Sequence, residues 1–300
     1  MKSELTKINK LVIITWIGLL TACGYPMGKN ENTSPEEATT DSQTEIVLAS
    51  DIEWSPLNPA RGDKSPQAGT IWGDRNGSGP TGFLVKFADG FSSPPHIHNV
   101  TYRGVVISGQ IHNDDPEAAE MWMPAGSFWT QPAGEGHITS ARGNINMAYI
   151  EIESGPYLVH PTEEAFDNGE KPVNVEQSNI VWLDAANLNW VDADKKTILG
   201  PKVAFLWGEP QENELFGTLV KLPAGFKGKI LSNAASFRAV VIQGSPVYHS
   251  SNVESESKTL ETGSSFSSKG NAVHRVSNPG EKESLIYIRA NAKYEFISEP

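Results

Sequence analysis

The sequence predicts an all-β protein built from two tandem copies of one domain. Short runs rich in Val, Ile, Phe, Tyr and Trp are separated by Gly, Pro, Asn and Asp, and no long segment shows helical periodicity. Residues 82–91, GFLVKFADGF, match residues 217–226, GTLVKLPAGF, without a gap. The same offset of 135 positions relates residues 103–109 to 238–244. The pattern indicates antiparallel sheets, and the repeat indicates that one domain occurs twice.

The first 22 residues have the composition of a removable leader. Three lysines precede the apolar run 11–20, which is followed by Leu20-Thr21-Ala22-Cys23. That run is about half of the roughly 20 residues that a membrane-spanning helix needs. The pattern resembles a bacterial lipoprotein signal. The resemblance implies cleavage before Cys23, lipidation of that residue and anchoring in the cell envelope, at the outer membrane if the organism is Gram-negative.

The mature chain is expected to be acidic and tethered. Residues 23–45 contain almost no apolar side chain, so they cannot offset the entropy of ordering and should form a disordered tether. The net formal charge is −12, and it becomes −14 once Lys2, Lys7, Lys10 and Glu4 leave with the leader. Without a basic cluster, such a chain is not expected to bind nucleic acid. Cys23 is the only cysteine, so no disulfide or thiolate ligand is expected in the folded part.

The repeat also sets the expected boundaries. The first domain should span residues 46–158 and the second residues 179–300, with 159–178 as a linker. The segments 52–54, IEW, and 180–182, IVW, open the two copies in similar ways. They are candidates for the strands by which the two halves embrace.

Two glycine-containing motifs in the first copy carry histidines at fixed spacings. One runs from Gly90 over five residues to His96-x-His98 and later Gly109; the other runs from Gly126 over five residues to Pro132-x-Gly134 and, two residues on, His137. These motifs resemble the two signatures of the cupin superfamily. The resemblance implies a jelly-roll fold for each copy. The whole layout further resembles an uncharacterised bicupin family, a domain of unknown function related in layout to the zinc-binding cupin of anti-sigma factors.

The three histidines are the expected metal ligands. His96 and His98 are one residue apart in a predicted strand, so their side chains point to one face. The cupin resemblance implies that His137 joins them from the second motif. Three neutral imidazoles would leave a divalent Fe, Mn, Ni or Zn ion with open positions. The sequence does not choose among these metals.

One position departs from the cupin pattern. The family usually has a glutamate separated from the second histidine by three or four residues, where this chain has Tyr102 and Arg103. Either the Tyr102 hydroxyl reaches the metal or substrate, or the site is of the three-histidine type. Phe237 matches Tyr102 in the second copy and favours a packing role for the ring. Arg103 matches Arg238, which suggests a structural role shared by both halves.

The second copy is expected to lack a metal site. At the offset of 135, Leu231 and Asn233 replace the first two histidines, and only His274 remains as the counterpart of His137. A single imidazole cannot hold a metal. His274 is therefore expected to be a hydrogen-bonded histidine, and the second domain to be structural or to close the first domain's pocket.

Beyond the metal ligands, the catalytic candidates are Tyr102, Glu135 and His112. Glu135 lies two residues before His137 and could act as a base, and His112 follows the Gly109 turn. The site resembles three-histidine cupin dioxygenases, which implies an oxygenase acting on a small organic molecule. The alternatives are a metal- or ligand-binding envelope lipoprotein without turnover, and a metal-dependent isomerase or hydrolase. A monomer is compatible with two domains already paired in one chain.

Overall fold

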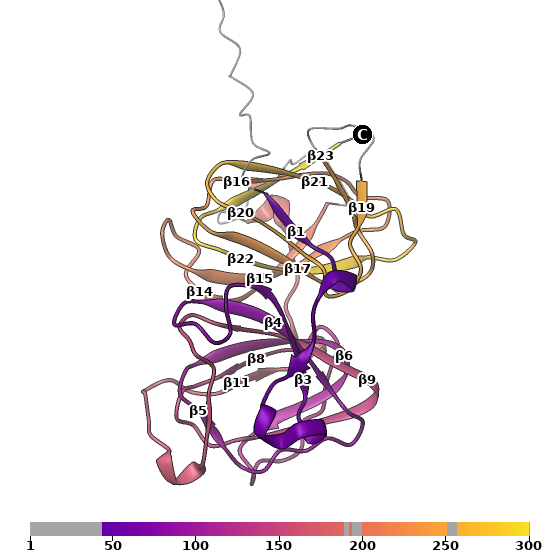
Figure 1. The fold of residues 1–300 in the computed structure, drawn as a ribbon. Coiled ribbons are helices and arrows are strands. Elements are labelled where there is room, and N and C mark those ends of the chain that lie inside the picture. Colours follow the sequence, from indigo (N-terminus) through magenta and orange to yellow (C-terminus); the bar gives the residue numbers. More distant parts are fainter. Residues whose placement is uncertain (1–43, 189–191, 194–199, 251–256, 300) are drawn as a thin grey trace, which may run out of the picture. The chain divides into compact units, whose positions relative to one another are not determined.

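The computed structural model describes residues 44–188, 192–193, 200–250 and 257–299. The expected leader, Cys23 and nearly all of the tether lie outside these residues. The described helices are short 3-10 turns: η2 (Ala49–Asp51), η3 (Pro59–Lys64), η4 (Thr162–Glu164), η5 (Gln177–Asn179) and η6 (Ala185–Asn187). Across the described part of the chain, no helix is long and apolar enough to cross a membrane. The remaining regular structure is β-strand, so the all-β prediction is confirmed (Figure 1).

The first domain contains an eight-stranded sheet and a two-stranded sheet. The large sheet has the order β11-β8-β6-β9-β4-β3-β2, with β7 paired to β6, and the small one pairs β10 with β5. The bounds are β2 (Ser55–Pro56), β3 (Gln67–Trp72), β4 (Thr81–Phe87), β5 (Ile97–His98), β6 (Tyr102–Asp114), β7 (Met123–Pro124), β8 (Phe128–Gln131), β9 (Ile138–Ile152), β10 (Val159–His160) and β11 (Val173–Val175).

The longest strands, β6 and β9, pair with each other and bend where their register shifts on either side of Ser108. Gly109 adopts a φ of +72° there, and a Cβ at this position would lie 2.0 Å from the Asn146 Oδ1 atom. Glycine alone fits such a bend.

The second domain contains a seven-stranded and a six-stranded sheet. Their orders are β1-β20-β17-β22-β15-β14-β12 and β13-β23-β16-β21-β18-β19. The bounds are β1 (Glu45–Val47), β12 (Leu183–Asp184), β13 (Asp192–Ala193), β14 (Lys202–Gly208), β15 (Phe216–Leu222), β16 (Lys227–Ser232), β17 (Phe237–Gln243), β18 (Val247–His249), β19 (Ser257–Thr259), β20 (Ser265–Ser268), β21 (Ala272–Ser277), β22 (Ser284–Ala290) and β23 (Tyr294–Ser298).

The strand that precedes each domain pairs with a sheet of the other domain. β1 precedes the first domain but pairs with β20 of the second, whereas β11 precedes the second domain but pairs with β8 of the first (Figure 1). The exchanged strands therefore lie a few residues before the expected segments 52–54 and 180–182, which instead pack into the apolar layer between the large sheets. The expected linker 159–178 contains β10 and β11, both paired with strands of the first domain.

Alternation along the strands explains why the repeated runs are apolar on both faces. In β4, Phe83 and Val85 point into the first domain's own core, whereas Leu84 points to the layer shared with the second domain. In β15, Val220 and Leu219 divide in the same way. A strand buried on both faces reads as a continuous apolar run, as in Phe83-Leu84-Val85.

The shared layer is joined by matching cation–π contacts. The Arg103 guanidinium lies 3.7 Å from the ring centre of Trp207, and the Arg238 guanidinium lies 4.1 Å from that of Trp72. Each arginine therefore reaches from its own domain onto a tryptophan of the other. This geometry gives the two repeated arginines the shared structural role that the sequence suggested.

Candidate metal centre

Backbone pairing brings the two histidine motifs together. His96 and His137 form an antiparallel bridge in which each N–H donates to the other's carbonyl at 3.0 Å. His98 lies in β5, and its carbonyl accepts from Gly134 N at 2.8 Å. Gly134 has a φ of +77°, and a Cβ there would lie 2.3 Å from the Phe166 carbonyl. The motif glycine therefore holds the histidine loop against β5.

The three imidazoles lie together, and Ile97, which separates the first two in the sequence, is buried. Their ligand atoms lie within 4.8 Å of one another, close enough for small side-chain adjustments to place them on one ion. Zinc, for comparison, binds imidazole nitrogen at about 2.0–2.1 Å. His98 and His137 are buried, and His96 is partly exposed at the opening. The expected cluster of His96, His98 and His137 is therefore assembled by the fold.

Backbone carbonyls orient all three rings. The Nδ1 atoms of His96, His98 and His137 lie 2.9, 2.8 and 3.2 Å from the carbonyl oxygens of Pro94, Leu158 and Glu135, respectively. A carbonyl can only accept, so each Nδ1 carries the proton and each Nε2 keeps its lone pair. This is the arrangement that fixes the tautomer of a metal-binding histidine.

The electrostatic surroundings keep these imidazoles neutral. Burial, reinforced by the two neighbouring imidazoles, holds the pKa of His98 well below its usual value. Burial lowers the pKa of His137 to about 3. Burial also lowers the pKa of His96, and the nearby charge of Arg61 adds to the effect. Neutral imidazoles are the form that binds a metal, so the donor set fits a divalent ion.

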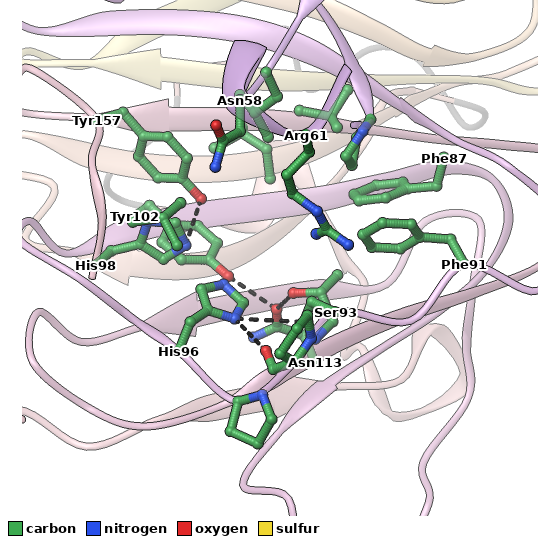
Figure 2. A pocket seen from close by; sticks show the side chains of 18 of the residues that line it. Asn58, Arg61, Phe87, Phe91, Ser93, His96, His98, Tyr102, Asn113 and Tyr157 are labelled. Atoms are coloured by element: carbon green, nitrogen blue, oxygen red, sulfur yellow. Dashed lines mark hydrogen bonds between the residues drawn. The ribbon is translucent and has the colours of Figure 1, made fainter. Parts of the chain in front are cut away.

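Two tyrosine hydroxyls border the cluster (Figure 2). The Tyr102 hydroxyl donates to Asn113 Oδ1 at 2.8 Å and lies 3.3 Å from His137 Nε2. The Tyr157 hydroxyl lies 3.0 Å from His98 Nε2, and its ring stacks on His98 with centroids 4.2 Å apart. Burial raises the pKa of both phenols, so both stay protonated. Tyr102 thus combines the two roles that its sequence position left open: its ring packs and its hydroxyl faces the cluster.

Replacing Tyr157 by phenylalanine is expected to strengthen metal binding. The His98 Nε2 lone pair accepts the Tyr157 proton in the metal-free protein, and this hydrogen bond must break when an ion binds. A net hydrogen bond is worth about 0.5–1.5 kcal/mol, so the affinity for Zn²⁺ should rise by roughly two- to tenfold. Competition with a chelating dye measures the change. A weaker affinity in Tyr157→Phe would mean that the hydroxyl supports the bound ion.

A cavity of about 300 Å³ opens beside the cluster. Its described lining residues all belong to the segment between positions 57 and 161, so the second domain does not close it, contrary to one expectation. The walls are mostly apolar, including Val85, Phe87, Phe91, Trp129 and Ile150. The opening also carries Arg61 and His160.

Residues 45–297 match a family described as a domain of unknown function, DUF4437. The chain belongs to this family. A search of curated protein sequences finds no match.

Among solved structures, the DUF4437 chain is similar to three proteins of different description. A "putative dioxygenase" from Nostoc punctiforme shares 13% identity, with 83% of each chain covered and a TM-score of 0.60. An oxalate decarboxylase from Lactobacillus farciminis shares 12% identity over 87% of this chain and 89% of that one, with a TM-score of 0.53. A vicilin from Corylus avellana shares 11% over 84% and 87%, with a TM-score of 0.52. At these identities the likeness establishes the fold, a bicupin.

Two of the expected catalytic residues lie outside the cavity of this DUF4437 chain. The Glu135 side chain lines a different surface depression, with Asp115 and Thr162, and only its backbone carbonyl contacts His137. His112 is buried, with Nδ1 3.3 Å from the Met121 carbonyl, and it does not line the cavity, whereas its neighbour Asn113 does. Successive side chains of a strand point to opposite faces, so Asn113 faces the cavity and His112 faces away from it. Neither residue lines the cavity, and the catalytic roles of Glu135 and His112 stay predictions.

Sequence reasoning missed three residues at the cavity. Tyr157 had a detectable signal, because Tyr294 matches it at the same offset of 137 that relates His137 to His274. His160 comes to the opening because β10 pairs with β5, and its Nδ1 lies 2.9 Å from Glu164 Oε2. Arg61 lies on η3, a segment outside the repeated sequence matches.

The second domain of this bicupin corrects the expected counterparts of the first two histidines. In β16, Ile230 pairs with His274 as His96 pairs with His137, so the counterparts are Ile230 and Ser232 rather than Leu231 and Asn233. The stretch from Gly225 to Ile230 is one residue shorter than the stretch from Gly90 to His96. A shift of one residue along a strand reverses which side chains face inward. His274 is buried between the Tyr248 hydroxyl at 3.1 Å and Ser268 Oγ at 3.0 Å, as expected of a hydrogen-bonded histidine.

Proposed function

We propose that this protein is a metal-dependent oxygenase that acts on a small organic molecule held in the cavity beside His96, His98 and His137. One observation carries the proposal: three neutral, pre-oriented imidazoles form a cluster, two of them, His96 and His98, line an apolar cavity, and no carboxylate joins the cluster within the described residues. An ion in such a set keeps its full positive charge and exchangeable positions. When bound, it would supply redox or Lewis-acid chemistry to substrate and oxygen.

The chain's own residues would hold the substrate, exclude water and orient polar groups toward the cluster. The apolar walls exclude water and hold the organic body of a substrate. The Tyr102 hydroxyl donates its hydrogen bond to Asn113 Oδ1, so the lone pairs of its oxygen face the cluster. Asn113 in turn accepts from Thr139 Oγ1 at 2.8 Å and donates to Gln131 Oε1 at 3.0 Å, which fixes its orientation.

The test is oxygen consumption by the iron-loaded protein. Purified metal-free protein would be loaded with Fe(II) without oxygen, then mixed with oxygen and panels of diketones, thiols and aromatic carboxylates. We expect substrate-dependent oxygen uptake and oxygenated product by mass spectrometry, both absent from His96→Ala/His98→Ala. Bound metal without turnover of any panel member would favour a metal- or ligand-binding protein.

A metal-dependent hydrolase or isomerase is a second candidate, because the structure supplies a base that the sequence did not reveal. His160 lines the cavity and contacts Glu164 through Nδ1, so its Nε2 is free to accept a proton. Product formed without oxygen by the zinc-loaded protein, and lost in His160→Gln, would favour this candidate over the oxygenase.

A further inference from the structure

We propose that Arg61 forms an anion subsite in this cavity, and that the ligand class is a small carboxylate with a flat apolar body. The proposal deepens the function above, since it names the substrate class of the same cavity. It rests on the position of the Arg61 guanidinium in a cavity whose other described lining residues carry no permanent charge.

The charge balance of the lining is one-sided. Among the described residues that line the cavity, Arg61 is the one with a permanent charge, and no aspartate or glutamate lines it. A bound metal would add further positive charge at the histidine end. A cavity with cationic groups and no lining carboxylate favours an anionic ligand over a neutral or cationic one.

The Arg61 guanidinium has no polar partner within the described part of the chain. Other arginines of this domain are engaged: Arg103 with Glu153 at 2.6 Å, and Arg142 with Gln110 at 2.6 Å. Arg61 makes a cation–π contact only, 5.7 Å from the centre of the Phe91 ring. Its fork of N–H donors is therefore available, and that geometry matches a carboxylate in a two-point contact.

The backbone that carries Arg61 is fixed. Asn58 caps η3, accepting from Ala60 N at 3.1 Å, and Ser65 Oγ accepts from Asn58 N at 2.8 Å. Arg61 N donates to the Asn58 carbonyl at 3.0 Å, which closes the turn. A guanidinium on a held turn loses less entropy on binding an anion than one on a free loop.

The apolar body of the ligand has a matching wall. Phe87 and Phe91 stand together, with ring centroids 5.4 Å apart, and Figure 2 shows Arg61 beside them and His96 across the cavity. A carboxylate on Arg61 therefore places an attached ring or short chain against these phenyl groups. The opposite end of the ligand then faces the histidines.

The experiment measures binding of benzoate and of its neutral isostere benzamide to the protein with both domains, by calorimetry and ligand-observed NMR. Metal is first removed with a chelator, so that a carboxylate cannot bind through the ion. We expect benzoate to bind severalfold more tightly than benzamide. Arg61→Gln should weaken benzoate by about tenfold or more and leave benzamide unchanged, because a hydrogen bond to a charged group is lost. Arg61→Lys should retain part of the preference.

Arg142→Gln is the matched control. It also removes an arginine that lies over an aromatic ring, at 4.1 Å from Trp122, but outside the cavity. Equal benzoate affinity in wild type and Arg61→Gln, equal affinity for benzoate and benzamide, or no saturable binding of benzoate would each overturn the subsite. Failure of the oxygenase proposal is distinguishable, because oxygen uptake would be absent while Arg61-dependent benzoate binding to metal-free protein persisted.

Discussion

The variant His96→Ala/His98→Ala is expected to lose its bound metal. Wild-type protein purified from cells, without leader and tether, should carry about one equivalent of a divalent ion, whereas the variant should carry less than about a tenth of that. His137 remains, but a single imidazole does not hold an ion against water. Inductively coupled plasma mass spectrometry of both proteins gives the stoichiometry and the identity of the metal.

Two controls make this result specific. His249→Ala removes a histidine of the second domain that bonds Ser277 Oγ at 2.8 Å and lies outside the cluster, so its metal content should equal that of wild type. Circular dichroism of the double variant should show a folded protein, since the His96–His137 pairing uses backbone atoms. Equal metal content in the double variant and the wild type, or no bound metal in either after reconstitution with Fe, Mn, Ni and Zn, would contradict the assignment of a metal centre.

The second large effect is expected in the layer between the domains. Glu151 is 1% exposed, and its two carboxylate oxygens accept from the Tyr149 and Tyr287 hydroxyls at 2.8 Å each. Arg289 Nε lies 3.6 Å from Glu151 Oε1, and Arg289 is also buried, at 3% exposed. Glu151→Ala leaves that guanidinium charge buried without its counter-ion, so the free energy of unfolding should fall by about 3–5 kcal/mol. Urea unfolding, followed by circular dichroism, measures this change.

Matched variants separate charge from packing at this position. Glu153→Ala removes a carboxylate two residues along the chain, from an exposed ion pair with Arg103, and should cost less than about 1 kcal/mol. Glu151→Leu/Arg289→Met removes both buried charges and should recover much of the loss, because apolar pairs replace buried ion pairs at little cost. If Glu151→Ala costs no more than Glu153→Ala, the buried network does not hold the domains together.

Much of the first domain's site was readable from residue spacing. A strand places alternate side chains on one face, so the spacing His96-x-His98 fixes two ligands without knowledge of the fold. The third ligand, His137, followed from the resemblance of the glycine, proline and histidine spacing to the two cupin motifs. The offset repeat similarly revealed two domains and pointed to the paired arginines, Arg103 and Arg238.

Other parts of the site depend on contacts that spacing does not encode. The second domain's inward-facing residues, Ile230 and Ser232, were missed because register is set by the partner strand, and a shortened turn shifted it by one position. Glu135 was placed near its histidine by sequence distance, but the loop turns its side chain to another surface. His160 falls within the segment 159–178 that was predicted to be a linker, although β10 pairs with β5 beside the cluster.

The sequence by itself determined the all-β class, the duplication and which half carries the histidine pair, because these follow from local periodicity and from comparison of the two copies. The grouping of His137 with His96 and His98 followed from the resemblance to the cupin motifs. The tertiary structure decided which oxygen atoms orient those imidazoles, which tyrosines border them, and that a lone arginine shares their cavity. Those contacts join segments tens of residues apart, and side-chain direction there follows from strand pairing and turn geometry that local sequence leaves open.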